Sequence, residues 1–400
     1  MITLSDKQDE NRDEKTYVRE FNSSKVMYYE DRIRKWQAGE RISPVTVDMA
    51  LTRACNYRCT YCYGQLQENG TSTGVDTNVD TSVDTSVDVD KLTWPHLQSF
   101  LEDCARLGVR GVSMVSDGES TCHPDYVKFI IYGKMLGLDM ALGTNGYLLT
   151  SQDLTSIVPH LTYLRFNISS GLPYDYARVH GVRPRHFYRV CGNILDSIAI
   201  RNKYKSSCTI GMQMVLTPNE GESIRSLTLL ALDLGVDYLV IKHCSDDEDG
   251  SLGIDYSRYE SLIPTLGWAE KQSNDKTRIV IKWSKILEGN KRAYKECYGP
   301  PFHIQLSGSG LVAPCGMLFN DKYSKYHIGN IKTQGFYDIV KGDRYWEVMN
   351  LLRGSEFDAR TMCGCLCLQH ETNKYLIDVV GGRDIGRDVG IACPKHISFL

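Results

Sequence analysis

Apolar residues recur along residues 92–243 with two different periods. Stretches with an apolar residue at every third or fourth position predict helices, and short apolar runs between them predict strands. The predicted helices cover residues 94–107, 124–136, 187–204 and 223–234, with another that starts near 151. The predicted strands cover residues 45–51, 111–116, 139–142, 161–168, 207–216 and 238–242. Such an alternation predicts right-handed βαβ units and a parallel sheet.

The strand count sets the expected architecture. Six strands of this kind predict an α/β fold, a partial (β/α)6 barrel that is about three-quarters of a full TIM-like barrel. We expect the barrel over residues 45–254, after an N-terminal tail and helix over residues 1–44. In such barrels the reactive residues gather at the C-terminal ends of the strands. Each strand end is therefore a place where chemistry is expected.

One segment of the barrel region has the composition of a flexible insertion. Residues 75–90 repeat a four-residue unit of the type Val-Asp-Thr-Ser and lack large apolar residues. Regularly spaced aspartates repel one another, and such a run cannot form a core. We expect a low-complexity surface insertion over residues 66–90.

The region after the barrel predicts a second, smaller domain. Residues 255–296 read as a linker region with a helix and a short strand. Residues 303–314 predict a hairpin with a Gly/Ser turn, which would bring Cys297 and Cys315 close together. We expect a small α+β cluster domain over residues 297–378 and a C-terminal tail over residues 379–400.

Composition and charge restrict the possible partners. The net charge is −3, which gives no electrostatic case for nucleic acid or a membrane surface. No apolar run approaches the length of a membrane span, and residues 1–22 are too polar for a secretory signal. Fourteen cysteines without such a signal favour metal or cluster ligation in a reducing cytoplasm over disulfides.

Three cysteines follow the first predicted strand at a C-x3-C-x2-C spacing, namely Cys55, Cys59 and Cys62. Three thiolates are one too few for a closed tetrahedral metal site. An iron–sulfur cubane held by three cysteines would leave one iron open to another molecule. A structural zinc loop or three buried thiols are the alternatives.

The octapeptide at residues 55–62 resembles the cluster-binding pattern of the radical S-adenosylmethionine (radical SAM) enzymes. Tyr61 matches the aromatic residue that usually precedes the last cysteine of that pattern. The resemblance implies a [4Fe-4S] cluster on Cys55, Cys59 and Cys62, whose open iron is chelated by SAM. It also implies an electron donor such as flavodoxin or ferredoxin.

The end of the second predicted strand resembles a further part of that family. Asp117-Gly118-Glu119 is similar to the family's Gly-Gly-Glu segment, which contacts the amino group of SAM. The resemblance implies that Gly118 and Glu119 bind the cofactor. Asp117 replaces the first glycine, so the local backbone geometry is a departure from the family pattern.

Two other strand ends carry polar residues. Asn167 and Ser169 alternate onto one face of the fourth strand, and the resemblance implies that they hold the carboxylate or ribose of SAM, with Arg165 as a further candidate. Lys242 and His243 end the sixth strand. They face either the substrate or a solvated rim.

The later cysteines resemble the C-terminal extension called SPASM, or its shorter form, twitch. Cys297, Gly310 and Cys315 match the C-x9-15-G-x4-C opening of that extension. Because only six cysteines lie beyond residue 290, one auxiliary [4Fe-4S] cluster is expected rather than two. Cys365 competes for a place in the ligand set, Cys393 is left out of it, and zinc in the same thiolates is the alternative. We expect the ligands to be Cys297, Cys315, Cys363 and Cys367.

The two resemblances together imply reductive cleavage of SAM to a 5′-deoxyadenosyl radical that abstracts a hydrogen atom from a substrate. A net oxidation of a small molecule similar to a sugar or aminocyclitol is the leading expectation. A peptide or protein maturase is the alternative. A non-catalytic iron–sulfur electron carrier and a zinc-binding interaction protein are alternatives of another class. No catalytic side chain is assigned beyond the cofactor and metal ligands.

Overall fold

The computed structural model describes residues 24–67, 91–289, 291–365, 367–385 and 394–400. The four-residue repeat at residues 75–90, the tail at residues 1–22 and Cys393 lie outside the described residues.

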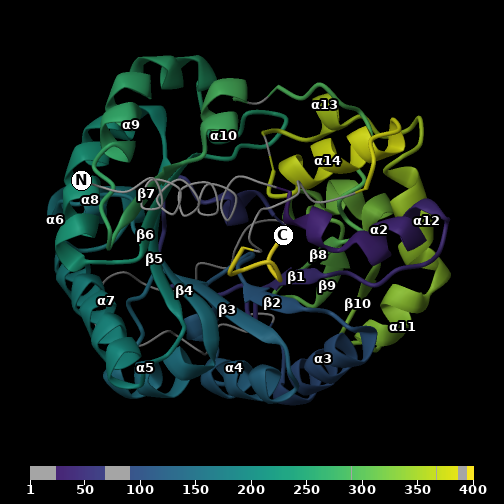
Figure 1. The fold of residues 1–400 in the computed structure, drawn as a ribbon, viewed down its shortest axis with the longest axis horizontal. Coiled ribbons are helices and arrows are strands. Elements are labelled where there is room, and N and C mark those ends of the chain that lie inside the picture. The colour runs from purple at the N-terminus through teal and green to yellow at the C-terminus, as the bar shows by residue number, and fades with distance from the viewer. Residues whose placement is uncertain (1–23, 68–90, 290, 366, 386–393) are drawn as a thin grey trace, which may run out of the picture.

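The strands form one 10-stranded sheet in the order β10-β9-β8-β1-β2-β3-β4-β5-β6-β7 (Figure 1). All pairs from β8 through β7 are parallel, whereas β9 pairs antiparallel with β8 and β10 pairs antiparallel with β9. The α/β fold with a parallel sheet is thus confirmed. The strands are β1 (Thr46–Met49), β2 (Gly111–Met114), β3 (Asp139–Thr144), β4 (Leu161–Asn167), β5 (Thr209–Leu216), β6 (Tyr238–His243), β7 (Arg278–Ile281), β8 (His303–Leu306), β9 (Leu311–Ala313) and β10 (Gly329–Asn330).

Helices cover the outer face of the sheet from α3 around to α9, and the C-terminal helices lie with α2 beside β8, β9 and β10 (Figure 1). Capping residues mark both ends of α3. Thr93 and His96 form a capping box at the start of α3, and Gly108 ends it with a φ of 73°. The helices are α2 (Glu30–Gln37), α3 (Trp94–Leu107), α4 (Tyr126–Met135), α5 (Ser151–Ile157), α6 (Pro173–His180), α7 (Arg185–Lys203), α8 (Gly221–Leu234), α9 (Ile263–Glu270), α10 (Trp283–Glu288), α11 (Phe336–Lys341), α12 (Asp343–Leu351), α13 (Ala359–Met362) and α14 (His370–Val380).

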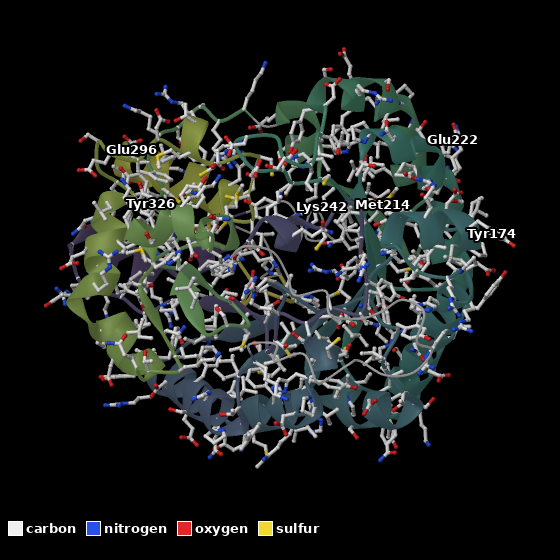
Figure 2. All side chains as sticks on the ribbon, turned by 180° about the vertical axis from the view of Figure 1, so that it is seen from behind. Tyr174, Met214, Glu222, Lys242, Glu296 and Tyr326 are labelled. Atoms are coloured by element: carbon white, nitrogen blue, oxygen red, sulfur yellow. The ribbon has the colours of Figure 1, made fainter. Side chains whose placement is uncertain are left out.

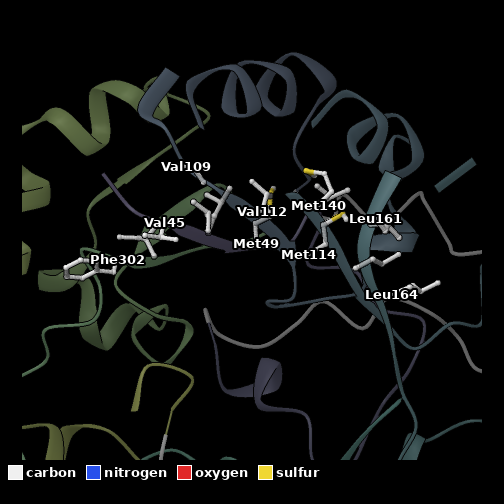
Figure 3. Close-up of a cluster of buried hydrophobic side chains, with 14 of the residues drawn as sticks. Val45, Met49, Val109, Val112, Met114, Met140, Leu161, Leu164 and Phe302 are labelled. Atoms are coloured by element: carbon white, nitrogen blue, oxygen red, sulfur yellow. The ribbon is translucent and has the colours of Figure 1, made fainter. Parts of the chain in front are cut away.

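Successive side chains of a strand point alternately to an apolar layer under the helices and to the polar interior of the barrel. Val112, Met114 and Leu164 point outward and are fully or almost fully buried in the layer between sheet and helices (Figure 3). Each fully buried side chain of this kind contributes about 1.5–3 kcal/mol to folding. Their neighbours Ser113 and Arg165 line a cavity on the other face. The outer layer therefore stabilises the barrel and leaves its interior to polar residues.

The segment expected as a linker, residues 255–296, is folded as part of the barrel. It contains α9 and α10, and β7 pairs in parallel with β6. The hairpin predicted at residues 303–314 is present, and its first strand, β8, also pairs in parallel with β1. The C-terminal region is thus joined to the barrel through one continuous sheet.

Residues 394–400 lie at the N-terminal end of the barrel, in the middle of the ring of strands (Figure 1). The hydroxyl of Thr46, at the start of β1, donates to the Ser398 carbonyl at 2.8 Å. Lys25 Nζ donates to the carbonyl oxygens of His396 and Phe399 at 3.0 and 2.9 Å. A Cβ on Gly111, at the start of β2, would lie 2.4 Å from the Ser398 oxygen. This segment therefore closes the end of the barrel opposite the cysteine loop.

Helices long and apolar enough to cross a membrane are absent from the described ranges.

Candidate active site and cysteine groups

The first cysteine loop follows the C-terminal end of β1 and is held there by α6. The Thr60 N–H donates to the Val179 carbonyl at 2.9 Å, and the Arg58 N–H donates to the His180 carbonyl at 3.2 Å. A Cβ on Gly181, which has a φ of 64°, would lie 2.5 Å from the Arg58 oxygen. The last turn of α6 is thus a backbone support for the loop.

Helix α6 and His180 were not predicted from the sequence. Two signals were nevertheless present, because Pro173 occupies the first turn of the helix and Gly181 follows its last residue with a left-handed conformation. A helix of only eight residues next to the much longer α7 gives a weak periodic signal.

His180 joins the cysteine loop to the end of β4, with one ring nitrogen on each side. Nε2 lies 3.1 Å from the Ser169 backbone nitrogen, which can only donate, so Nε2 carries no proton. Burial lowers the pKa of His180 to about 3, so the ring is neutral and its proton is on Nδ1. Nδ1 lies 3.2 Å from Cys59 Sγ and 3.5 Å from the Tyr61 hydroxyl. The imidazole therefore donates a hydrogen bond toward the Cys59 sulfur.

The three cysteines of the loop are half-buried, and their thiols have little contact with solvent. Burial raises the pKa of Cys55 well above its ordinary value, and the charges of Glu119 and the other loop cysteines raise it further. Burial also raises the pKa values of Cys59 and Cys62. Such thiols ionise only beside a positive centre, which is the chemistry that metal ligation supplies. Within the described ranges, no three His, Cys, Asp or Glu side chains are grouped tightly enough to hold a single metal ion.

Glu119 is a buried carboxylate at the end of β2. Its Oε1 accepts from the hydroxyls of Thr121 and Thr144 at 2.8 and 2.7 Å, and its Oε2 accepts from the Asn145 N–H at 2.7 Å. Burial raises the pKa of Glu119, and these hydrogen bonds oppose the rise. The carboxylate is thus held in one orientation, with capacity left on Oε2 for a cationic amine.

Gly118 lies against the backbone that leads into the cysteine loop. Its φ is 94°, and a Cβ there would lie 2.2 Å from the Thr52 oxygen. Only glycine fits this combination of positive φ and close approach. The position therefore requires the glycine that the sequence has.

Asp117, the departure from the family pattern, has a structural partner in the C-terminal region. Its carboxylate accepts from the Ser307 hydroxyl at 2.6 Å and from the Gly308 N–H at 3.0 Å. It also lies 3.6 Å from Arg53 Nε, two residues before the first cysteine of the loop. Asp117 thus connects the cysteine loop, the end of β2 and the hairpin of β8 and β9.

Asn167 and Ser169 lie near the end of β4, and their oxygens have protein donors. Asn167 Oδ1 accepts from Gln213 Nε2 at 3.0 Å, and Ser169 Oγ accepts from the Val215 N–H at 3.2 Å. Ser169 is completely buried, whereas Asn167 is half-buried. Asn167 therefore has more room for a ligand than Ser169.

The five later cysteines in the described part of the chain divide into a group of four and one separate thiol. Burial raises the pKa of Cys315 well above its ordinary value, and the charges of Cys363, Cys367 and Cys297 raise it further. Because charges act in this way only at short range, these four cysteines lie together. Cys365 instead hydrogen-bonds the Tyr256 side chain on the barrel side. The turn between them is tight, since a Cβ on Gly364 would lie 2.1 Å from the Asp246 oxygen.

Arg292 holds the backbone of this cysteine segment and was not predicted from the sequence. It is buried, and its Nη1 donates to the carbonyls of Ala359 and Cys363 at 3.2 and 2.9 Å. Its Nη2 donates to the Cys365 carbonyl. A buried arginine bonded to carbonyl oxygens keeps its positive charge close to the thiols, which favours an anionic group there.

One cavity of about 440 Å³ lies between the two cysteine groups. Tyr61 and Cys62 line it on one side, and Cys315 and Cys367 line it on the other. Polar residues of the barrel interior complete the wall, among them Lys242, which lies near the middle of the molecule (Figure 2). The volume is that of a small-molecule site.

These features define a partial α/β barrel with a three-cysteine loop at its reactive end and a second cysteine group across a shared cavity. The family comparisons identify that class. The model of the radical SAM superfamily matches residues 49–227, and the model of the SPASM iron–sulfur cluster-binding domain matches residues 297–367. The chain belongs to the radical SAM superfamily and carries a C-terminal SPASM-type domain. Its cofactors are accordingly SAM, the [4Fe-4S] cluster that binds it and auxiliary iron–sulfur chemistry in the SPASM-type domain.

Several known proteins are similar over much of the chain. An AdoMet-dependent heme synthase of Methanosarcina barkeri (strain Fusaro / DSM 804) is 26% identical over 344 residues, which are 80% of this chain and 88% of that protein. A probable GTP 3′,8-cyclase of Thermococcus kodakarensis (strain ATCC BAA-918 / JCM 12380 / KOD1) is 25% identical over 185 residues, 45% of this chain and 51% of that protein. SuiB of Streptococcus suis bound to S-adenosylmethionine superimposes with a TM-score of 0.59 at 14% identity, covering 90% of this chain and 79% of SuiB. The structural similarity establishes a shared fold.

Proposed function

We propose that this enzyme binds SAM against the cluster of Cys55, Cys59 and Cys62 and acts on a small molecule in the cavity, in a net oxidation or similar modification. When bound, the cluster and SAM supply a 5′-deoxyadenosyl radical that takes a hydrogen atom from the substrate. The observation that carries the proposal is the cavity of about 440 Å³, because residues of both cysteine groups line it.

The surrounding residues have distinct proposed roles toward SAM. Glu119 Oε2 accepts from the amino group, and the backbone at Gly118 lets the cofactor approach closely. Asn167 and Ser169 hold the polar ends of the cofactor, and the Ser169 N–H already fixes the orientation of His180. Tyr61, which is 9% exposed, packs beside His180 with a ring distance of 5.7 Å and keeps water from the loop.

We assign the auxiliary cluster to Cys297, Cys315, Cys363 and Cys367, with Cys365 outside it. Four thiolates close the coordination of one [4Fe-4S] cluster, so its role is electron transfer rather than substrate ligation. The external electron donor is a small protein such as flavodoxin or ferredoxin. Cysteines that must remain thiolates favour a reducing cytoplasm as the setting.

A peptide or protein maturase is the second candidate. SuiB bound to its precursor peptide SuiA has a TM-score of 0.57 to this chain, at 13% identity, which supports the shared fold. The closed floor at residues 394–400 and the cavity volume favour a small molecule over an extended peptide. Neighbouring genes would discriminate, since a short peptide gene favours the maturase and sugar or cyclitol genes favour the oxidation.

Iron analysis and SAM cleavage test the proposed function. Protein purified without oxygen is expected to contain about eight irons per chain, because each cubane holds four. With reductant and SAM it should form 5′-deoxyadenosine. Cys59→Ala is expected to retain about four irons and to lose 5′-deoxyadenosine formation, and Cys297→Ala should lose the other four irons.

Two other cysteines give matched controls for that experiment. Cys208→Ala removes a thiol that is buried in the hydrophobic core and donates to the Thr209 carbonyl at 3.8 Å, and it should keep both clusters. Cys365→Ala should also keep both, because Cys365 lies outside the proposed ligand set. Zinc in place of iron would contradict the proposal, and iron without SAM cleavage in the presence of cell extract would favour an electron carrier.

His180 is expected to tune the first cluster. His180→Leu removes the Nδ1 donor at 3.2 Å from Cys59 Sγ, and hydrogen bonds to cluster sulfurs favour the reduced state. We expect the reduction potential of the first cluster to fall by about 40 mV, which corresponds to the loss of about 1 kcal/mol for one electron. An anaerobic redox titration followed by electron paramagnetic resonance measures the shift.

The conservative variant separates this effect from a packing defect. His180→Asn keeps a donor near the position of Nδ1, and its potential is expected to lie closer to that of the unmodified protein. Iron content shows whether the loop still assembles. Equal potentials in the leucine variant and the unmodified protein would mean that His180 only supports the loop.

A further inference from the structure

The cavity wall carries more positive than negative side chains. Five basic residues line it, and the side-chain carboxylates on the same wall are Asp48 and Glu371. Asp48 already faces His303, with Oδ2 at 2.9 Å from Nε2. The basic residues are Lys25, Arg165, Lys242, Lys282 and Lys285.

Three of these five basic residues have neighbours that stabilise their positive charge. Lys25 donates to the carbonyls of His396 and Phe399. The charge of Glu371 acts on both Lys282 and Lys285 and favours their protonated forms. Arg165 and Lys242 are the two remaining cations, and the group that stabilises their charge has still to be identified.

Arg165 and Lys242 lie in the barrel interior without an acidic partner among the described residues. Arg165 Nε is buried and has no hydrogen-bond partner there, and its guanidinium lies 5.6 Å from the Tyr163 ring centroid. No hydrogen bond or ion pair within the described ranges engages Lys242. The buried hydroxyl of Ser116, on the same cavity wall, also lacks a partner in the described part of the chain. Buried polar groups of this kind normally have partners.

The electrostatic environment of Lys242 favours the binding of an anion beside it. Burial, followed by the charges of Lys285 and Arg165, lowers its pKa to about 7, while the charges of Cys365 and Cys244 oppose the change. Burying uncompensated cations costs free energy, and an anion between them offsets that cost.

The strand register places Arg165 below the strand ends. Arg165 pairs with Gly143 on β3 and with Gly211 on β5, two residues before Asn167 in the direction of the barrel floor. Lys242 pairs with Val215 on β5, whose N–H donates to Ser169 Oγ, so Lys242 lies level with Ser169 while Arg165 lies deeper. Both side chains line the cavity.

We propose that Arg165 and Lys242 form a binding subsite for an anionic group of the substrate, a carboxylate or a phosphate. The planar guanidinium binds such a group through paired hydrogen bonds, Lys242 adds a point charge, and Ser116 donates from the wall. The subsite deepens the proposed function, on which the identification of its ligand as substrate rests. It assigns the substrate to anionic small molecules.

Competitive labelling of Lys242 tests the subsite in the cluster-loaded full chain under anaerobic conditions. An amine-acetylating reagent is applied at pH 7, and peptide mass spectrometry compares Lys242 with the exposed Lys271. Inorganic phosphate and succinate are the two competitors, with chloride at equal ionic strength as the reference. A bound anion that raises the pKa of Lys242 by about one unit should slow its labelling about fivefold, with Lys271 unchanged.

The outcomes separate the proposal from its alternatives. Protection by phosphate, by succinate or by both supports the subsite and indicates which anion it prefers, and Arg165→Gln should remove that protection. Equal labelling in all three salts overturns the subsite, whether or not the variant folds. Protection by SAM with none by phosphate or succinate overturns it as well, because the two cations would then belong to the SAM site. Failure of 5′-deoxyadenosine formation in the same preparation, with protection retained, would contradict the proposed function alone.

Discussion

Gly118→Ala is expected to abolish SAM cleavage. The added Cβ would lie 2.2 Å from the Thr52 oxygen and 2.9 Å from the Arg53 backbone, and the φ of 94° is unfavourable for any side chain. The backbone cannot yield at either contact without moving the residues that lead into Cys55. A displacement of about 1 Å at a reacting site costs on the order of 100-fold in rate, so 5′-deoxyadenosine formation should fall at least that far.

Gly137→Ala is the matched control for this substitution. Gly137 has a similar φ of 84°, yet a Cβ there would meet nothing within 4 Å. The variant should therefore show only the conformational cost of a positive φ, about 1–2 kcal/mol of stability, with SAM cleavage retained. Similar activity in the two variants would mean that the close approach at Gly118 does not position the loop.

The sequence predicts most of the barrel because its signals are local. Capping residues, apolar periods and glycines mark α3 and the strands of the barrel. The cysteine spacing likewise predicts the first cluster site, because a loop after a strand brings its own residues together. The group formed by Cys297, Cys315, Cys363 and Cys367 is less determined, since Cys365 has the same local spacing as its neighbours. The packing of Gly364 against Asp246 is what directs Cys365 toward the barrel.

Features that depend on distant contacts were not predictable in the same way. The closure of the barrel joins Thr46 to Ser398, a pair separated by 352 residues. The parallel pairing of β8 with β1 joins segments more than 250 residues apart. Neither contact has a sequence pattern of its own, because a buried polar pair is specified by the folded neighbours of both residues. The interior cations are a similar case, since only the folded barrel shows that Arg165 and Lys242 line one cavity.

Asp117 helps to hold the two cysteine groups together. A glycine at that position has no side chain to reach the C-terminal region. Asp117 is 1% exposed and bonds to the turn between β8 and β9, which leads to Cys315. Its charge also faces Arg53, which precedes Cys55. One carboxylate thus fixes both approaches to the cavity.

Asp117→Ala is accordingly expected to destabilise the protein by about 3–5 kcal/mol, because it removes the buried carboxylate that faces the largely buried Arg53 and leaves the Gly308 N–H without this acceptor. A lowered urea midpoint of unfolding measures the loss. Asp117→Asn keeps the shape of the side chain and should recover part of the lost stability.

Asp343→Ala is the control at the surface. It removes an exposed ion pair with Arg41 at 2.7 Å and should change stability by less than about 1 kcal/mol. Equal midpoints for Asp117→Ala and Asp343→Ala would show that the carboxylate does not join the two regions.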